Sequence, residues 1–420
     1  MHTPIDTIII IGNGFDIWQG MNTSYSSFKQ YYYSHIDEIL RQLHLKKHSI
    51  IDDSGHEIQI SDVELVYGNP FDPEPLPDEF WGSFETSLSD VDAEMLNLFF
   101  GKDRSGLKRM RRCIKNARKI LQKAFCGWIA SIQVDPVNTR YRFGDNCYII
   151  NFNYTDTLRK RFGVDEDHEY HIHGEATDGD SLIFGHASHP MEPEYALHRF
   201  GGRFRGLYYV DELLYETDKH VRDNIQLLCM NLAVSGVDAN KVTDVYILGQ
   251  SMSPPDLEYY VFLNEAFSVH NDRNDEVLEC GASDELDSLE EMANRIHYVI
   301  EHVGYQTDEE EIAEECRSSI MRRYNEEQHL RNVRLEKRFM RAISIYEKLH
   351  FWRKKKTTEK EELPATRTQN ATWHVAYHGE KDRIWKEHVA KELGMQFTVH
   401  PSIEECLEML SVRTCPINNS

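Results

Sequence analysis

The sequence lacks any long hydrophobic run. No window reaches the roughly 18–20 uninterrupted apolar residues that a membrane-spanning helix needs. The segment Met1–Asp6 has neither a basic stretch nor a small-residue cleavage site, and the following run Ile8–Ile11 is too short for a signal peptide. We therefore expect a cytoplasmic protein that has no membrane partner.

Paired cysteines are also missing. The eight cysteines stand at positions 113, 126, 147, 229, 280, 316, 406 and 415, and no two of them form a Cys-x-x-Cys pair. In a reducing compartment such scattered residues are expected to be free thiols, several of them filling the core. The pattern argues against a cysteine zinc site, and no metal cofactor is expected.

Positive charge is scarce. The chain has 47 Lys and Arg residues against 70 Asp and Glu residues, which gives a net charge of −23. This balance argues against a general nucleic-acid binder, because phosphate binding needs a positive surface. It leaves room for a local basic face. The 420 residues, 40% hydrophobic and 28% charged, suit one large globular core or a core with a helical annex.

Several short apolar runs end abruptly in glycine, asparagine, histidine or aspartate. Runs of this length without alternation are typical of strands covered on both faces, as parallel sheets require. The sequence therefore predicts an α/β fold, a three-layer Rossmann-like parallel sheet flanked by helices. Ligands bind such sheets at the carboxyl ends of the strands. The runs are Thr7–Ile11, Tyr148–Phe152, Tyr170–Ile172, Leu182–Phe184, Val245–Leu248 and His374–Tyr377.

A helix with one basic face is predicted between the first two runs, over Leu107–Ile132. Apolar residues recur there at helical spacing, and eight Lys and Arg residues cover the other face. A solvated surface explains this pattern, and so does a docking surface for RNA, DNA or an acidic partner. The eight are Lys108, Arg109, Arg111, Arg112, Lys115, Arg118, Lys119 and Lys123.

A charged helical annex is predicted late in the chain, at residues 265–368. The chain turns acidic from Asn271, as in Asp308–Glu311, and becomes basic again at Arg353–Lys356. The predicted organisation is thus a nucleotide-binding α/β core, formed by residues 1–264 and 369–420, with this annex inserted before the last strand.

The first candidate site follows the strand at Thr7–Ile11 and reads Gly12-Asn13-Gly14-Phe15-Asp16, with Thr23-Ser24-Tyr25 shortly after. Glycine allows a close backbone approach to a ligand, and the free N–H groups of a helix start can bind an anion such as a pyrophosphate. The motif is not the dinucleotide fingerprint, because Ile17 stands where a third glycine would belong. A tight structural turn explains it equally well.

The second candidate site reads Asn151-Phe152-Asn153-Tyr154-Thr155-Asp156. An asparagine amide at a strand end can orient a water molecule or a ribose hydroxyl. The alternative is a simple turn, in which asparagine and aspartate cap the next helix.

The third candidate site is Tyr170-His171-Ile172-His173-Gly174. Within a strand, His171 and His173 would point the same way. With an unperturbed pKa of about 6.5, histidine suits general base work. Two alternatives remain, namely isolated structural histidines or a metal site. The metal site would draw on His168, His171, His173, His186 and His189, whose spacing matches no known ligand pattern.

The fourth candidate site is Gly249-Gln250-Ser251, with Asp256 a few residues on. An aspartate here can cap a helix or hold ribose hydroxyls. Because the sequence lacks Gly-x-Ser-x-Gly, we interpret Ser251 as a ligand contact rather than a nucleophile.

These four sites, in this order, resemble the bacteriophage abortive infection AbiH family. The likeness runs from residue 8 to about residue 260, and a strand at Trp373–Tyr377 fits the family's closing segment. The resemblance implies a phage-defence protein with a phage or host trigger. It leaves the oligomeric state open.

AbiH sequences in turn resemble sirtuin-like domains that cleave NAD. This more distant likeness implies NAD as substrate or ligand and hydrolysis of its N-glycosidic bond. It implies that Gly12 and Gly14 face the pyrophosphate, Asn153 holds water or ribose, and His173 is the general base. Ser251 and Asp256 would contact the adenosine side. The remaining candidate binding residues are Asn13, Asp16, Tyr25, Thr155, Asp156, Gly174 and Gly249.

Two residues depart from the sirtuin-like pattern. Asp16 replaces a small serine. Two like charges about 4 Å apart repel by about 4 kcal/mol at an effective dielectric of 20, whereas a helix N-terminus offers roughly 0.3–1 kcal/mol. Asp16 must therefore turn away from a pyrophosphate, to cap the helix or bind ribose, or the ligand is not NAD. Thr155 replaces an acid, although Asp156 follows it. The alternative functions are a non-catalytic nucleotide sensor and a nucleic-acid-directed effector.

Overall fold

The computed structural model describes residues 4–51, 55–71, 74–101, 103–136, 139–175, 182–187, 205–267 and 370–414. Its centre is a six-stranded sheet with the order β5-β4-β1-β6-β7-β8, in which every neighbouring pair is parallel. The strands are β1 (Thr7–Ile11), β4 (Cys147–Asn151), β5 (Glu169–His171), β6 (Asp244–Leu248), β7 (Thr372–Ala376) and β8 (Phe397–His400). The predicted α/β fold with a helix-flanked parallel sheet is confirmed.

The strand order places a topological switch point between β1 and β6. From β1 the chain first adds β4 and β5 on one side, then crosses over to add β6, β7 and β8 on the other. This is the doubly wound order, in which ligands bind outside the carboxyl ends of the strands where the order reverses. The ends of β1 and β6 therefore mark the place to look for a site.

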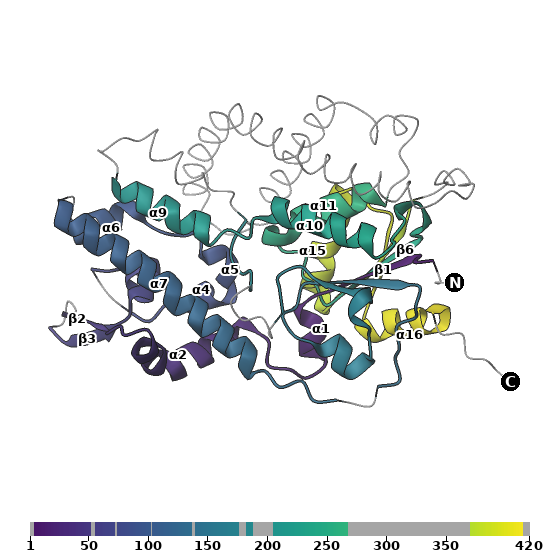
Figure 1. The fold of residues 1–420 in the computed structure, drawn as a ribbon, viewed down its shortest axis with the longest axis horizontal. Helices are drawn as coiled ribbons and strands as arrows, with labels where there is room; N and C mark the ends of the chain where they lie inside the picture. The colour runs from purple at the N-terminus through teal and green to yellow at the C-terminus, as the bar shows by residue number, and fades with distance from the viewer. Residues whose placement is uncertain are drawn as a thin grey trace, which may run out of the picture.

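Helices cover both faces of the sheet (Figure 1). Alternate residues of β1 point to opposite faces, so Ile8 and Ile10 join one hydrophobic cluster while Ile9 and Ile11 join another. Complete burial on both sides explains the unbroken run of isoleucines. The first cluster is covered by α10 (Val221–Val234), α11 (Leu257–Ala266) and α15 (Gly379–Glu392), and the second by α1 (Asn13–Trp18), η1 (Leu158–Phe162) and α16 (Ile403–Thr414).

A separate helical unit lies beside the sheet, to the left in Figure 1. Most of it is inserted between β1 and β4, and it has its own core, in which Phe28, Trp81, Phe84 and Phe125 contact one another. It comprises α2 (Tyr25–Gln42), β2 (His48–Ile51), β3 (Glu57–Ile60), α3 (Asp62–Tyr67), α4 (Asp78–Gly82), α5 (Phe84–Ser87), α6 (Ala93–Phe100), α7 (Arg104–Ser131) and α9 (Arg205–Glu216).

The predicted strand at Leu182–Phe184 is wrong. Within 182–187 the structure has only an isolated bridge, between His186 and Asp218. Leu182 and Phe184 pack instead into the core of the helical unit, which explains why this short stretch is apolar. The edge strand β8 and the hairpin of β2 and β3 were not predicted, because their half-exposed residues form no continuous apolar run.

The predicted amphipathic helix at Leu107–Ile132 is confirmed as α7, which begins after the N-cap Asp103. Residues 265–267 end α11, and the rest of the predicted annex, with its acidic stretch and the basic cluster at 353–356, lies outside the described residues. Within the described ranges, no helix combines the length and apolar composition needed to cross a lipid bilayer.

Candidate functional site

The predicted site motifs meet at the carboxyl ends of β4, β1 and β6. The side chain of Asn153 donates a hydrogen bond to the carbonyl of Gly12 over 3.1 Å. The amide of Gly14 donates to the carbonyl of Gly249 over 2.7 Å. Nε2 of His173 lies 3.8 Å from Oδ1 of Asp256. Segments more than 200 residues apart in the chain are therefore in contact at this edge.

The glycines in these motifs allow two loops to pack together. A Cβ at Gly12 would lie 2.5 Å from Cα of Gln250, and one at Gly14 would lie 2.6 Å from the carbonyl oxygen of Gly249. Gly249 itself has a φ of +71°, which favours glycine. The space beside Gly12 and Gly14 is thus filled by backbone, as the structural-turn alternative proposed. A role of these glycines toward a pyrophosphate stays a prediction.

The amide groups at the start of α1 are partly used within the protein. The amide of Gly14 bonds to Gly249, and that of Phe15 donates to the carbonyl of Gly12. Asn13 donates through its side chain to the carbonyl of Thr23 over 2.8 Å, which holds the loop that leads to Tyr25. Asn13 therefore has a structural partner, and Tyr25 enters the site from the first turn of α2, where it bonds to Glu85.

Asp16 points into the protein. Its Oδ2 accepts a hydrogen bond from Oγ1 of Thr155 over 2.5 Å, and Thr155 in turn contacts Thr157. Oδ1 of Asp16 is buried and has no hydrogen-bond partner in the part of the chain that the structure describes. Burial raises the pKa of Asp16 to about 6, although bonds from Thr155 and Thr157 oppose the rise. Asp16 does not cap α1, and it is a titratable group near neutral pH.

His173 is buried among the rings of Phe152, Tyr154 and Tyr259. Burial, and then the nearby ammonium of Lys219, lower its pKa to about 3, so the ring is neutral. A backbone bond to Phe152 holds the ring, and its Nε2 has no hydrogen-bond partner among the described residues. His173 thus presents an unused polar atom beside Asp256.

The prediction that His171 and His173 share a strand, and so a direction, is wrong. β5 ends at His171, and His173 lies in the following turn before Gly174, whose φ is +80°. The alternation of strand side chains does not extend across that turn. The two rings have different partners and therefore different roles.

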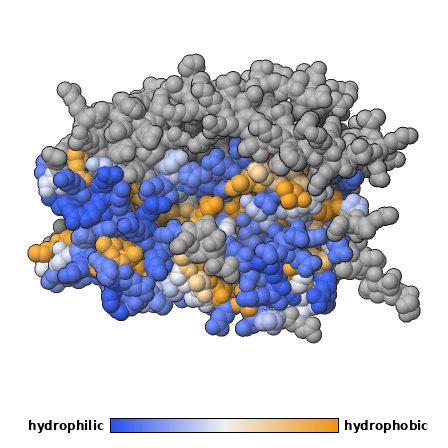
Figure 2. All heavy atoms as spheres, in the orientation of Figure 1, coloured by the Kyte–Doolittle hydropathy of each residue, from blue (hydrophilic) through white to orange (hydrophobic). Residues whose placement is uncertain are grey.

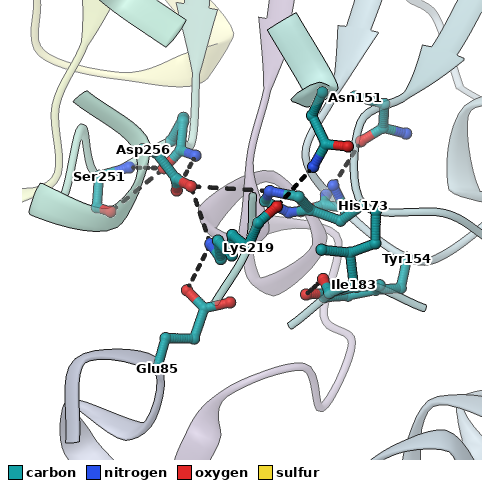
Figure 3. Close-up of polar contacts among 11 residues, drawn as sticks. Glu85, Asn151, Tyr154, His173, Ile183, Lys219, Ser251 and Asp256 are labelled. Carbon is teal, nitrogen blue, oxygen red and sulfur yellow. Dashed lines mark hydrogen bonds and ion pairs between the residues drawn. The ribbon is translucent and has the colours of Figure 1, made fainter. Parts of the chain in front are cut away.

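A buried ion network adjoins His173 and was not predicted (Figure 3). Nζ of Lys219 donates to Oε2 of Glu85 over 3.0 Å and to Oδ1 of Asp256 over 2.9 Å. Oδ2 of Asp256 accepts from the side chain of Gln250 over 3.0 Å. No sequence motif marks Lys219 or Glu85, because neither follows a strand of the sheet.

The single ammonium of this network offsets only part of the cost of burying two carboxylates. Burial alone would raise the pKa of Asp256, but Lys219 outweighs it and lowers that pKa. Burial raises the pKa of Glu85 despite the same ammonium. One cation therefore faces two carboxylates, and the region stays electrically negative when both are ionised.

His171 positions the backbone of Asn153. Nδ1 of His171 contacts the carbonyl of Asn153 at 2.8 Å, and the amide of Asn153 donates to the side chain of Asn151 over 2.9 Å. Oε1 of Glu169 accepts from Asn151 over 2.6 Å and lies 3.1 Å from Nε2 of His171. Burial would lower the pKa of His171, but the bond to Glu169 raises it. Glu169 thus contacts both residues that hold the backbone of Asn153, and no sequence motif predicted it.

Other predicted residues lie at the margin of this cluster. Asp156 pairs with Lys160 over 2.9 Å, one helical turn away. Ser251 is exposed, and its amide and hydroxyl both face the side chain of Gln250. His168 bonds to the carbonyl of Cys147, and His186 contacts Thr217 and Asp218. These histidines are apart, His189 is outside the described residues, and within the described ranges no three metal-ligating side chains form a group.

The family model of bacteriophage abortive infection AbiH matches residues 8–274, which include all these motifs. No curated protein and no solved structure matches the chain. The matched region covers more than half of the sequence. The chain therefore belongs to the bacteriophage abortive infection AbiH family and is a phage-defence protein.

Proposed function

We propose that this AbiH protein binds NAD or a related nucleotide at the switch point of its sheet and hydrolyses the bond between nicotinamide and ribose. The observation that supports the proposal is a set of buried polar atoms without hydrogen-bond partners among the described residues, in which Oδ1 of Asp16 and Nε2 of His173 belong to predicted site residues at the strand ends. Buried polar groups without partners are rare in folded proteins and call for an explanation. A bound polar ligand supplies one.

The charge of the site favours a cationic reaction centre. Two carboxylates, those of Asp256 and Glu85, face the single ammonium of Lys219, and Asp16 adds a further carboxyl group. The nicotinamide ring of NAD is positively charged, and its departure leaves positive charge on the ribose. Preorganised negative groups stabilise such a transition state, and this term is usually the largest in enzyme catalysis.

Asn153 and His173 can serve different steps of the hydrolysis. The glycosidic bond breaks with its electron pair leaving on a neutral nicotinamide, so no acid is needed. Asn153, clamped by Asn151 and His171, orients ribose or water. A water molecule bonded to Nε2 of His173 adds its oxygen to the ribose carbon, and its proton is released to solvent with the product. Because the pKa of His173 is about 3, the neutral ring positions this water by accepting its hydrogen bond and does not keep the proton.

Release of nicotinamide from NAD by the purified full chain tests the proposal, with and without extract of infected cells. The variant His173→Ala should lose about 10²-fold in rate, because the attacking water loses the acceptor that positions it. His168→Ala is the matched control, because His168 contacts the first residue of β4 at the opposite edge of the sheet, and its rate should be unchanged. Full activity of His173→Ala, or no release from an activated sample, would refute hydrolysis.

A nucleotide sensor without turnover is the second candidate. It is favoured by one observation, namely that both oxygens of Asp256 are already bonded, to Lys219 and Gln250. Calorimetry distinguishes the two candidates, because tight binding of NAD without release of nicotinamide supports the sensor.

A further inference from the structure

Helix α7 concentrates positive charge in an acidic protein. Its 28 residues contain nine Lys and Arg and no Asp or Glu, whereas the whole chain carries a net charge of −23. Surface helices usually mix both signs, because opposite charges one turn apart stabilise the helix. The absence of any acidic residue along α7 therefore needs a reason beyond helix stability.

The exposed cations of α7 form a straight stripe. Five exposed positions lie within about 80° of the helix circumference at 3.6 residues per turn, and they extend for about 22 Å at 1.5 Å per residue. The apolar face of α7 is buried in the core of the helical unit. This packing fixes the orientation of the helix, so the stripe always faces away from that core. The members of this α7 stripe are Lys108, Arg112, Lys115, Lys119 and Lys123.

Most of the α7 stripe has no intramolecular partner. Two other basic residues of the helix are used internally, since Arg118 pairs with Glu216 over 3.0 Å and Arg109 donates to the carbonyl of Phe100 over 3.0 Å. By contrast, four members of the stripe make no ion pair or hydrogen bond within the described ranges: Lys108, Arg112, Lys119 and Lys123. Each like-charged pair one turn apart costs roughly 0.2–0.5 kcal/mol, so an external anion is the natural complement.

We propose that the α7 stripe binds the sugar-phosphate backbone of a double-stranded nucleic acid. A row of cations about one helical turn apart, roughly 5.4 Å, complements a row of phosphates. Single-strand binders add aromatic side chains on which bases stack, whereas the aromatic residues of α7, Phe125 and Trp128, are buried. Contacts to phosphates alone position a duplex without reading its sequence.

The net charge of the protein does not prevent this contact. At physiological ionic strength, charges separated by more than about 8 Å are largely screened. The electrostatic potential near α7 is therefore determined by the α7 stripe and not by the net charge of the protein. Figure 2 shows a mainly hydrophilic surface over the left half of the molecule, where α7 lies. An acidic protein partner fits less well, because protein interfaces have an apolar centre and the exposed large hydrophobic residues include none from α7.

Fluorescence anisotropy with a labelled DNA duplex and the full chain tests the proposal. Four phosphate contacts, one for each unpaired member of the stripe, predict a slope of about −3.6 for the logarithm of affinity against that of salt, so affinity should fall about 150-fold from 50 to 200 mM KCl. No binding at 50 mM KCl, or binding without a salt slope, would overturn the proposal. So would binding of polyglutamate by the stripe without binding of the duplex.

Paired substitutions locate the contact. Lys119→Gln with Lys123→Gln should reduce the slope by about 1.8, because two phosphate contacts are lost. Lys381→Gln with Lys391→Gln changes the charge equally at two exposed positions of α15, and the slope should stay constant. Equal losses in both pairs would contradict the assignment. Nicotinamide release should be the same in the Lys119 and Lys123 variant as in the native chain, which separates the stripe from the nucleotide site.

Discussion

The helical unit and the strand ends both bury carboxylates, but they satisfy them differently. In the helical unit the two oxygens of Glu64 bond to Tyr32 and Ser61, and those of Asp62 bond to His48 and Asn116. At the strand ends only one oxygen of Asp16 has a partner in the described part of the chain. Burial of carboxylates is common to both regions, and among these three carboxylates only Asp16 has an oxygen without a partner in the described part of the chain.

This difference is what the proposed nucleotide site predicts for its polar groups. A fully bonded buried network makes the local structure unique and rigid, whereas an incomplete one costs free energy. The glycine loops show the same division, since their close packing is structural, while Oδ1 of Asp16 and Nε2 of His173 remain unbonded among the described residues. Three substitutions test this comparison, beginning with the largest expected effect.

Lys219→Met should destabilise the protein most. It leaves Glu85 and Asp256 buried without their cation, and breaking a buried pair usually costs about 3–5 kcal/mol. Chemical denaturation measures the free energy of unfolding. Lys241→Met is the control, because its pair with Asp238 is exposed and worth at most about 1 kcal/mol.

A second change keeps this prediction testable if Lys219→Met fails to fold. Adding Glu85→Gln removes one of the two unpaired charges and should restore part of the lost stability. A cost below about 1 kcal/mol for Lys219→Met would show that the network is solvated and that the comparison is wrong.

Asp16→Asn should change how stability depends on pH. The pKa of Asp16 is raised from 3.8 to about 6 in the folded protein, so between these values the folded state holds a proton that the unfolded chain has released. Stability therefore falls as pH rises through this window, by about 3 kcal/mol in all. The variant cannot ionise, so its advantage over the native chain should grow by most of that amount between pH 4 and pH 7.

Denaturation curves at several pH values measure this difference. Asp156→Asn is the control, since Asp156 lies in the neighbouring loop and pairs with Lys160 at the surface. The loss of this surface pair should cost less than about 1 kcal/mol. A difference for Asp16→Asn that does not change with pH would mean that Asp16 is not the buried group described above.

Gly14→Ala should have the smallest of the three effects. The new Cβ would lie 2.6 Å from the carbonyl oxygen of Gly249, and relieving such overpacking costs typically about 1–3 kcal/mol. Gly82→Ala in the helical unit is the matched control. Nothing lies within 4 Å of a Cβ at Gly82, a helical position, so that variant should be neutral or slightly stabilising. Equal melting temperatures for both variants would refute loop packing at Gly14.

The sequence predicted the sheet well because double burial leaves a local signal. Runs such as Thr7–Ile11 are apolar throughout, which alternating or helical patterns do not produce. The edge strand Phe397–His400 is half-exposed and gives no such signal, while Leu182–Phe184 gives it falsely because it docks on the helical unit. The order of the strands depends on where the chain crosses over, which no local pattern records.

The candidate site was predictable from the sequence where it follows strand ends, but its other residues were not. Asn153, His173 and Asp256 follow short apolar runs, so position along the chain identified them. Lys219 and Glu85 reach the same place from a loop and from a short helix of the insertion, and only the packing of the two regions brings them there. The unpaired state of Asp16 likewise depends on burial, which the sequence does not reveal.

The ammonium of Lys219 joins the two cores, because Glu85 belongs to the inserted helices and Asp256 to the sheet. One buried cation therefore links the inserted helices to the sheet. Without it, the carboxylates of Glu85 and Asp256 would repel each other across the seam between the two cores.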